Sequence, residues 1–260
     1  MTNGLAGQTV VVTRPAGQAE TLCHLIEQQG GKALRFPTLA IESVAIAAES
    51  LQQALDSDWL IFTSTNAVNF ALEAFGGKMS NAGRLKMAAV GQSTAKALHD
   101  AGYTVKCVPQ ADFSSEGLLA EPDMYQVAGK KITIVRGVGG REKLAETLRH
   151  RNAQISTFEV YQRTMPEIDK GPLMLALARG AISATTITSA EALNNLLAML
   201  DDESVNRLKA RPLIVVSSRI GQLATQLGFT GVTVSPQAAD AAIFQTLTTL
   251  LNGENSDRSN

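Results

Sequence analysis

The sequence has little of what marks nucleic-acid-binding, exported or membrane proteins. Its 260 residues carry 23 Lys plus Arg against 24 Asp plus Glu, so the basic excess typical of a nucleic-acid binder is absent. No apolar run approaches the roughly 20 residues of a membrane-spanning helix. Residues 1–9 lack the basic and apolar segments of a signal peptide. We therefore expect a soluble, cytoplasmic protein that binds neither nucleic acid nor membrane.

The usual metal, redox and catalytic patterns are also missing. The two cysteines, Cys23 and Cys107, fall in a predicted helix and a predicted strand, where thiols usually fill a core. The three histidines share no metal-ligand spacing. There is no Gly-x-Ser-x-Gly elbow and no Walker sequence, and Glu142 stands where a dinucleotide fingerprint would need its third glycine. We expect neither a metal nor a cofactor.

Short apolar runs alternate with helical patterns along the whole chain. Strands are predicted over residues 9–13, 33–36, 59–63, 87–90, 104–108, 131–135, 155–161, 185–188, 213–216 and 232–234. Helices are predicted between them, among others over residues 16–29, 67–75, 94–101, 141–151, 190–200, 220–227 and 238–251. Several strands are apolar at successive positions, as expected when both faces of a sheet are covered. The alternation predicts an α/β fold with doubly wound parallel sheets.

The second half of the chain repeats the first. "VVVTRPAGQAETL" resembles "TIVRGVGGREKLAETL", "IFTSTNAVNFAL" resembles "TITSAEALNNLL", and "AAVGQSTAKALHDAGY" resembles "IVVSSRIGQLATQLGF". The three pairs follow in the same order at a nearly constant offset, which predicts two lobes of one fold with about five strands each. We expect the protein to work in a cleft between the lobes.

The lobes are predicted to exchange parts, because no linker marks the repeat boundary near residues 124–129. Two extended stretches near prolines, 35–42 and 158–163, are better candidates for crossings. These considerations predict lobe 1 from residues 1–36 plus 165–252, lobe 2 from residues 43–157, crossing linkers at 37–42 and 158–164, and a flexible tail at 253–260.

Polar turns follow the predicted strands, where doubly wound sheets bind their ligands. Hydroxyl residues and glycines at these turns leave backbone N–H groups exposed at helix N-termini, which suits anions. The candidate substrate-binding residues are Arg14, Thr63, Ser64, Thr65, Asn66, Gly91, Ser93, Thr94, Arg136, Gly137, Gly139, Gly140, Arg141, Thr188, Ser189, Ala190, Ser217, Ser218 and Arg219.

Helix capping is the competing role for each single turn, since such residues are ordinary N-caps worth about 1 kcal/mol. The arginines favour an anion, because a cation at a helix N-terminus opposes the helix dipole. Tyr161, at the end of a predicted strand, either faces the cleft or is a half-buried packing residue.

Together these segments resemble the uroporphyrinogen-III synthase family. The similar stretches are "VVVTRPAGQAETL", "IFTSTNAV", "AAVGQSTAKAL", "ITIVRGVGGRE", "ISTFEVYQR", "TITSAEAL" and "LIVVSSRIGQLATQLGF", and they extend over residues 10–250. "RGVGGRE" followed by "VYQR" is the most specific part. In the last block, "SSRI" replaces the Gly- and Thr-rich turn of some relatives.

The resemblance implies two flavodoxin-like lobes joined by a two-stranded linker, and an enzyme of tetrapyrrole and haem biosynthesis that needs no cofactor. Its substrate would be hydroxymethylbilane, a linear tetrapyrrole with eight carboxylates. The enzyme would release water and close the ring through a spiro-pyrrolenine intermediate, with inversion of the terminal pyrrole. Tyr161 would be catalytic, as proton donor to the departing hydroxyl. Ser64 and Thr94 match hydroxyl positions of the family's cleft.

Two other classes stay open at this stage. A two-lobed sensor that binds small anions without catalysis, similar to periplasmic binding proteins, would share the lobes but needs an export signal. A nucleotide-dependent α/β enzyme is disfavoured by the incomplete glycine pattern. Nothing in the sequence indicates an oligomer, so we expect a monomer. The preceding enzyme of the pathway is a candidate partner that would hand over the substrate.

Overall fold

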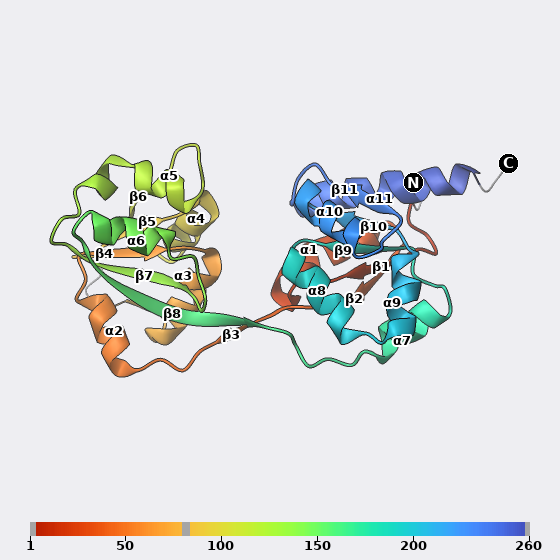
Figure 1. Cartoon of the computed structure of the whole chain (residues 1–260), viewed down its shortest axis with the longest axis horizontal. Helices are drawn as coiled ribbons and strands as arrows, with labels where there is room; N and C mark the ends of the chain where they lie inside the picture. The colour runs from red at the N-terminus through yellow and green to blue at the C-terminus, as the bar shows by residue number, and fades with distance from the viewer. Residues whose placement is uncertain (1–3, 80–83, 258–260) are drawn as a thin grey trace. The chain divides into compact units, whose positions relative to one another are not determined.

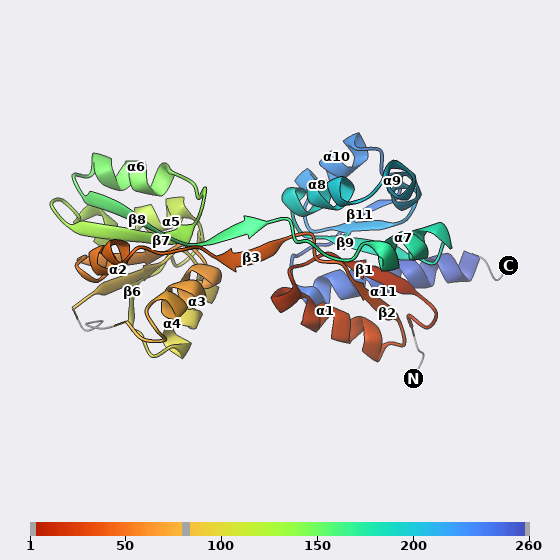
Figure 2. The ribbon, with the colours of Figure 1, turned by 90° about the horizontal axis from the view of Figure 1, so that it is seen from below.

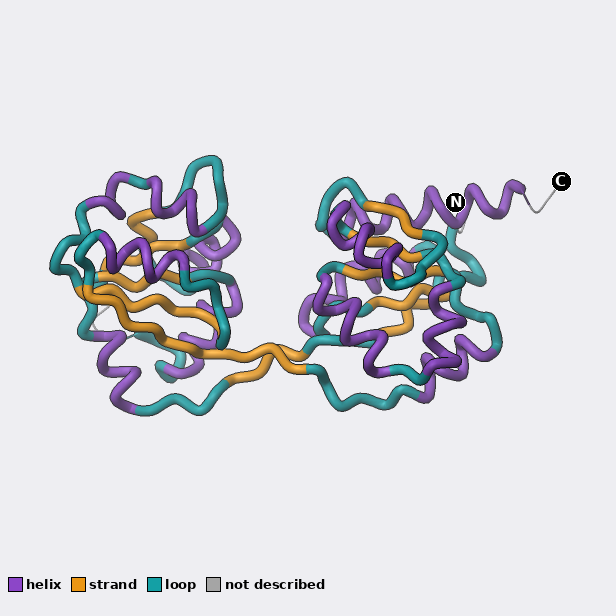
Figure 3. Tube along the Cα trace, in the orientation of Figure 1, coloured by secondary structure: helices purple, strands orange, loops and turns teal. Residues whose placement is uncertain are grey.

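The computed structural model describes residues 4–79 and 84–257 (Figure 1). The chain divides into two compact units: unit 1 combines Met1–Ala40 with Thr164–Asn260, and unit 2 is Ile41–Arg163. Each unit is built on its own sheet with helices on both faces (Figure 2). The Cα trace shows the same layering of strands between helices in each unit (Figure 3).

The sheet of unit 1 has the strand order β11-β10-β9-β1-β2, and all its described pairs are parallel. The strands are β1 (Thr9–Val12), β2 (Lys32–Arg35), β9 (Ala184–Ile187), β10 (Leu213–Val215) and β11 (Val232–Val234). The helices are α1 (Ala16–Gln28), α7 (Gly171–Ala178), α8 (Ala190–Met199), α9 (Asp202–Lys209), α10 (Ser218–Gln226) and α11 (Asp240–Asp257). Thus the central strands of this sheet come from the two ends of the chain.

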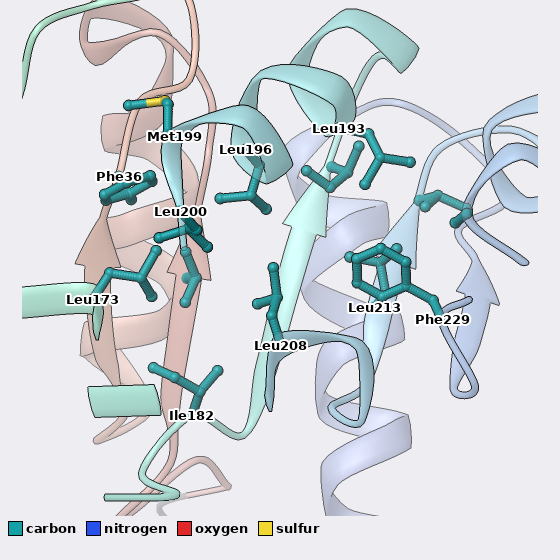
Figure 4. Close-up of a cluster of buried hydrophobic side chains, with 14 of the residues drawn as sticks. Phe36, Leu173, Ile182, Leu193, Leu196, Met199, Leu200, Leu208, Leu213 and Phe229 are labelled. Carbon is teal, nitrogen blue, oxygen red and sulfur yellow. The ribbon is translucent and has the colours of Figure 1, made fainter. Parts of the chain in front are cut away.

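Successive apolar residues of these strands enter different cores. Val11 packs into a cluster with Leu213 and Leu193 under α7–α10, whereas Val10 and Val12 pack with α1 and α11 on the other face. Figure 4 shows the first of these clusters, with aliphatic side chains from several helices meeting above the strands. Each fully buried aliphatic side chain stabilises the fold by roughly 1.5–3 kcal/mol, which explains why Val10, Val11 and Val12 are apolar at successive positions.

The sheet of unit 2 has the order β3-β8-β7-β4-β5-β6. The strands are β3 (Ala40–Ser43), β4 (Trp59–Phe62), β5 (Lys86–Ala89), β6 (Val105–Cys107), β7 (Lys131–Gly137) and β8 (Gln154–Thr164). The helical segments are α2 (Ala48–Leu55), α3 (Thr65–Ala74), α4 (Gln92–Asp100), α5 (Ser115–Ala120), the 3-10 turn η1 (Pro122–Tyr125) and α6 (Lys143–His150). Leu60 and Phe62 of β4 pack toward α3 and α4, while Trp59 and Ile61 pack toward α5 and α6.

All ten predicted strands are present, so the α/β fold with parallel sheets is confirmed. The structure differs from the predicted linker over residues 158–164. Strand β8 continues to Thr164, and its residues Phe158, Val160 and Tyr161 belong to the core of unit 2. Burial of their side chains fixes this stretch to the sheet, so most of it is a core strand rather than a linker.

The predicted tail at residues 253–260 overlaps the last helix. Helix α11 continues to Asp257, and residues 258–260 lie outside the described part of the chain. Gly253 does not end the helix, because its backbone is not among the left-handed glycines that usually form such ends. No helix within residues 4–79 and 84–257 is long and apolar enough to cross a membrane.

Candidate active site

A cavity of about 570 Å³ lies at the carboxyl ends of the strands of unit 2. Residues from β7, β8, the β4–α3 turn and the loops before α5 and α6 form its wall. They are Thr63, Ser64, Val90, Phe113, Ser114, Ser115, Ile134, Arg136, Gly137, Val138, Gly139, Gly140, Arg141, Leu144, Tyr161 and Arg163. The fold therefore brings Thr63 and Ser64 of the first repeat to the same place as Tyr161 and the predicted site residues of "RGVGGRE".

Tyr161 forms part of this wall and is also a packed core residue. Its side chain is buried, and its ring stacks on Phe70 with 5.7 Å between ring centroids. A hydrogen bond joins its Oη to Ser64 Oγ at 3.2 Å. Ser64 Oγ in turn accepts the backbone N–H of Ala67 at 3.1 Å and so caps α3. The tyrosine hydroxyl is therefore held beside the positive end of a helix.

Gly137 makes room for the ring of Tyr161. A Cβ atom at position 137 would lie 2.6 Å from both Cε2 and Cζ of that ring. The register shifts here, since Arg136 faces Glu159 but Gly137 faces Tyr161. The Val138 N–H then donates to the Tyr161 carbonyl at 2.8 Å. This β-bulge and the glycine together aim the tyrosine at the cavity.

Arg136 is neutralised within the chain. Its guanidinium is 2.7 Å from a Glu142 oxygen and 3.2 Å from a Glu159 oxygen, and it donates to the Gly140 carbonyl at 3.2 Å. The loop of residues 137–142 wraps around the side chain, with Gly139 at a φ of +71°. We expected Arg136 to need a bound anion. Two carboxylates of the protein already supply the charge that it needs.

Two other arginines of the cavity lack such partners. Arg141 and Arg163 are exposed, and neither side chain makes an ion pair or hydrogen bond with the described residues. Arg141 was among the predicted site residues, whereas Arg163 was not, although the "VYQR" motif contains it. These two cations, rather than Arg136, are free to meet an anionic ligand.

The corresponding turns of unit 1 lie at the carboxyl ends of the adjacent strands β1, β9 and β10. Ser189 Oγ accepts the Ala192 N–H at 3.0 Å and caps α8. Ser217 caps α10 in the same way. Capping, the competing role, is thus confirmed for these serines and for Ser64. Thr188 and Ala190 flank Ser189 and are half-buried.

As in unit 2, one arginine of unit 1 is paired with a carboxylate and another has no partner among the described residues. Arg14 forms an ion pair with Asp240, the first residue of α11. Arg219 is exposed and has no partner within residues 4–79 and 84–257. Its neighbour Ser218 lines a separate groove between α10 and β11.

The remaining predicted residues do not line the unit 2 cavity. Thr65 and Asn66 lie half-buried in the first turn of α3, and Ser93 is exposed in the first turn of α4. Thr94, also in α4, is only 3% exposed and lies on the buried side of that helix. Gly91 precedes α4, and a Cβ there would be 3.7 Å from that of Phe113.

The cysteines are core residues, as predicted. Both thiols are buried, and burial raises the pKa of Cys107 to about 11 and raises that of Cys23 as well. Among the described residues there is no cluster of three or more His, Cys, Asp and Glu side chains that could hold a metal ion.

The fold and these turns define an α/β protein with a polar cavity at the carboxyl ends of parallel strands. Residues 20–245 match the family model described as "Uroporphyrinogen-III synthase HemD". The chain is 32% identical over 248 residues to uroporphyrinogen-III synthase of Salmonella typhimurium, covering 92% of this chain and 99% of the relative. It is 30% identical over 244 residues to the Escherichia coli K12 enzyme of that name, with the same coverage. The chain belongs to the uroporphyrinogen-III synthase family, which confirms the resemblance drawn from the motifs.

A solved structure supports the fold. A crystal structure of a mutant uroporphyrinogen III synthase from the extremely thermophilic bacterium Thermus thermophilus aligns with a TM-score of 0.61 at 18% identity. The alignment covers 95% of this chain and 99% of that chain.

Proposed function

We propose that this protein cyclises hydroxymethylbilane to uroporphyrinogen III. The observation that carries the proposal is the Tyr161 hydroxyl, which is hydrogen-bonded to Ser64 in a chain of this family. The same cavity contains Arg141 and Arg163, which have no partner among the described residues. The net change is the loss of one water, so neither an oxidant nor a reductant is required. This chemistry is consistent with a protein that needs no cofactor.

The reaction begins when the terminal hydroxyl leaves as water and the ring that carried it becomes an azafulvene. The substituted carbon of the last pyrrole attacks this electrophile and forms the spiro-pyrrolenine. The bond from the spiro carbon to its original bridge then breaks, and the bridge carbon bonds to the other free position of the ring. Loss of a proton restores the inverted pyrrole.

Tyr161 is proposed to donate the proton that the departing hydroxyl needs. Ser64 Oγ already accepts the Ala67 N–H, so its own hydrogen is free to point at the tyrosine oxygen. In that arrangement the tyrosine hydrogen points away from Ser64, toward a ligand. The positive end of α3 and the serine O–H would stabilise the phenolate that forms.

The remaining task is to hold one conformation of a flexible polyanion. We propose that the turn around Gly139 in unit 2 binds carboxylates of the substrate through its backbone N–H groups. The turns around Ser189 and Ser217 in unit 1 present groups of the same kind. Uncatalysed closure gives the symmetrical isomer, so orientation of the last ring decides the product. No single one of these turns needs to be essential.

We also propose finer features of the family for this chain. The strand order β2-β1-β9-β10-β11 of unit 1 supports a flavodoxin-like description of the units. The pairing of β3 with β8 supports a two-stranded link. We also propose a cytoplasmic monomer that receives its substrate from the preceding enzyme.

The test is to supply freshly generated hydroxymethylbilane and to separate the product isomers by chromatography. We expect mainly the type III isomer, formed faster than spontaneous closure. Formation of the symmetrical isomer alone, at the uncatalysed rate, would refute the proposal. Binding of the bilane without turnover would instead favour the anion sensor.

Tyr161→Phe tests the proposed proton donor. We expect turnover to fall by about a hundredfold or more, the usual contribution of a general acid. Tyr125→Phe is the matched control, because that ring is 62% exposed and lies in η1 away from the cavity. Unchanged turnover of Tyr161→Phe would exclude the hydroxyl from the chemistry.

A further inference from the structure

We propose that Phe113 and Arg163, together with Arg141 and Val138, form a subsite for one pyrrole ring that bears acetate and propionate arms. This inference rests on the proposed function and adds Phe113, Val138 and Arg163, which were not among the predicted site residues, to Arg141, which was. All four side chains line the same cavity of unit 2.

The apolar part of the subsite is unusual for a surface. Phe113 is 53% exposed and Val138 is 52% exposed, and both side chains line the cavity of unit 2 described above. Exposed apolar side chains grouped around a concave site typically mark ligand binding. A pyrrole has a flat, electron-rich face, which suits contact with an aromatic ring and an aliphatic side chain.

The backbone segments that carry both apolar side chains are fixed by local contacts. Gly117 lets the preceding loop fold back onto α5, because a Cβ there would lie 1.8 Å from the Asp112 carbonyl oxygen. Ser114 Oγ accepts the Gly117 N–H at 3.1 Å and fixes the same loop. The Val138 N–H is bonded to the Tyr161 carbonyl. A ligand therefore meets a preformed surface.

The charged part matches the two arms of the ring. Arg136 is occupied by Glu142 and Glu159, so it cannot supply a free cation without losing those partners. Arg141 and Arg163 carry no counter-charge from the described residues. Two free guanidinium groups beside an apolar wall suit a planar ring with two carboxylates.

The experiment measures binding of a monopyrrole that carries one acetate and one propionate arm, by titration calorimetry with the full chain. The corresponding diester is the comparison ligand, because it keeps the ring and removes both charges. We expect the diacid to bind and the diester to bind much less. Binding does not depend on turnover, so a failure here is distinct from a failure of the cyclisation assay.

Substitutions at Phe113 and Arg163 test whether the diacid binds at the proposed subsite. Phe113→Ala and Arg163→Gln are each expected to weaken diacid binding about tenfold, the size of one lost ring contact or charged hydrogen bond. Phe113→Trp and Arg163→Lys keep the ring face and the charge, and should retain most of the affinity. With hydroxymethylbilane the same losses should raise KM and leave kcat nearly unchanged.

Tyr125→Ala and Arg179→Gln are the matched controls, since both residues are exposed outside the cavity. Their affinities should stay within about twofold of the parent chain, as for ordinary surface changes. Equal affinities for Phe113→Ala, Arg163→Gln and these controls would overturn the subsite. So would a chain that converts the bilane but does not bind the diacid.

Discussion

Gly137→Ala would place a methyl group where the ring of Tyr161 now lies. The added carbon would be 2.6 Å from two ring atoms, whereas carbon atoms pack best at about 3.5–4.0 Å, so ring and backbone must separate by roughly 1 Å. The ring cannot retreat freely, because Phe70 stacks on it within the core of unit 2. The backbone of Gly137 is not left-handed, so the clash with the ring is the only cause of strain.

This overpacking should lower the free energy of unfolding by about 1–3 kcal/mol, measured by urea denaturation. The same displacement moves the hydroxyl away from Ser64. A shift of about 1 Å in a catalytic group can reduce turnover about a hundredfold, which the cyclisation assay would detect. Gly17→Ala in α1 is the control, because no atom lies within 4 Å of its added carbon. It should leave both quantities unchanged or raise stability slightly.

A double-mutant cycle decides whether the ring is responsible. In a Tyr161→Ala background the methyl group at position 137 meets no ring, so its added effect on stability should nearly vanish. If Gly137→Ala lowers the free energy of unfolding equally in both backgrounds, the clash with the Tyr161 ring is not the cause of the destabilisation.

Further predictions concern a cap, the thiols and acid stability. Ser189→Ala should lower the free energy of unfolding by about 1 kcal/mol and Ser189→Gly by much less, since glycine is tolerated at an N-cap; equal losses would contradict a capping role. At neutral pH, Cys23 and Cys107 should react with a chromogenic disulfide only after unfolding, because burial raises the pKa of both thiols; fast reaction of the native chain would contradict this. The Ser204 N–H lowers the pKa of Asp201, so this carboxylate stabilises α9 above its unfolded pKa, and the stabilisation is lost as pH falls through the lower folded pKa. Asp201→Asn should therefore weaken the loss of stability on acidification; an unchanged acid profile in urea denaturation would exclude this contribution.

Strands could be predicted because their signal is local. A run such as Trp59–Phe62 is apolar at every position, and only a strand covered on both faces uses all four side chains in cores. Helices α2, α5, α7 and α9 were not identified beforehand. They are six to eight residues long, too short for a helical period to repeat often.

The site could be predicted only in outline. The turns were identified because parallel strands end at one edge of a sheet. The neutralisation of Arg136 was missed, because its partner Glu159 lies 23 residues away and meets it only through pairing of β7 with β8. Phe113 and Arg163 were missed for a similar reason. A single exposed side chain has no periodic signal, and its significance comes from neighbours that the fold brings together.

The origin of unit 1 from both ends of the chain has a consequence for biosynthesis. Strand β1 lies between β2 and β9 in the sheet, so the first βα unit leaves the ribosome long before residues 184–187 exist. Unit 2 is continuous and can fold first, as domains do during synthesis. In the meantime the backbone N–H and C=O groups on the edge of β1 that β9 will cover have no native partner. The nascent chain should therefore depend most on chaperones while the middle third of the message is translated, and a translational pause before β9 should promote aggregation.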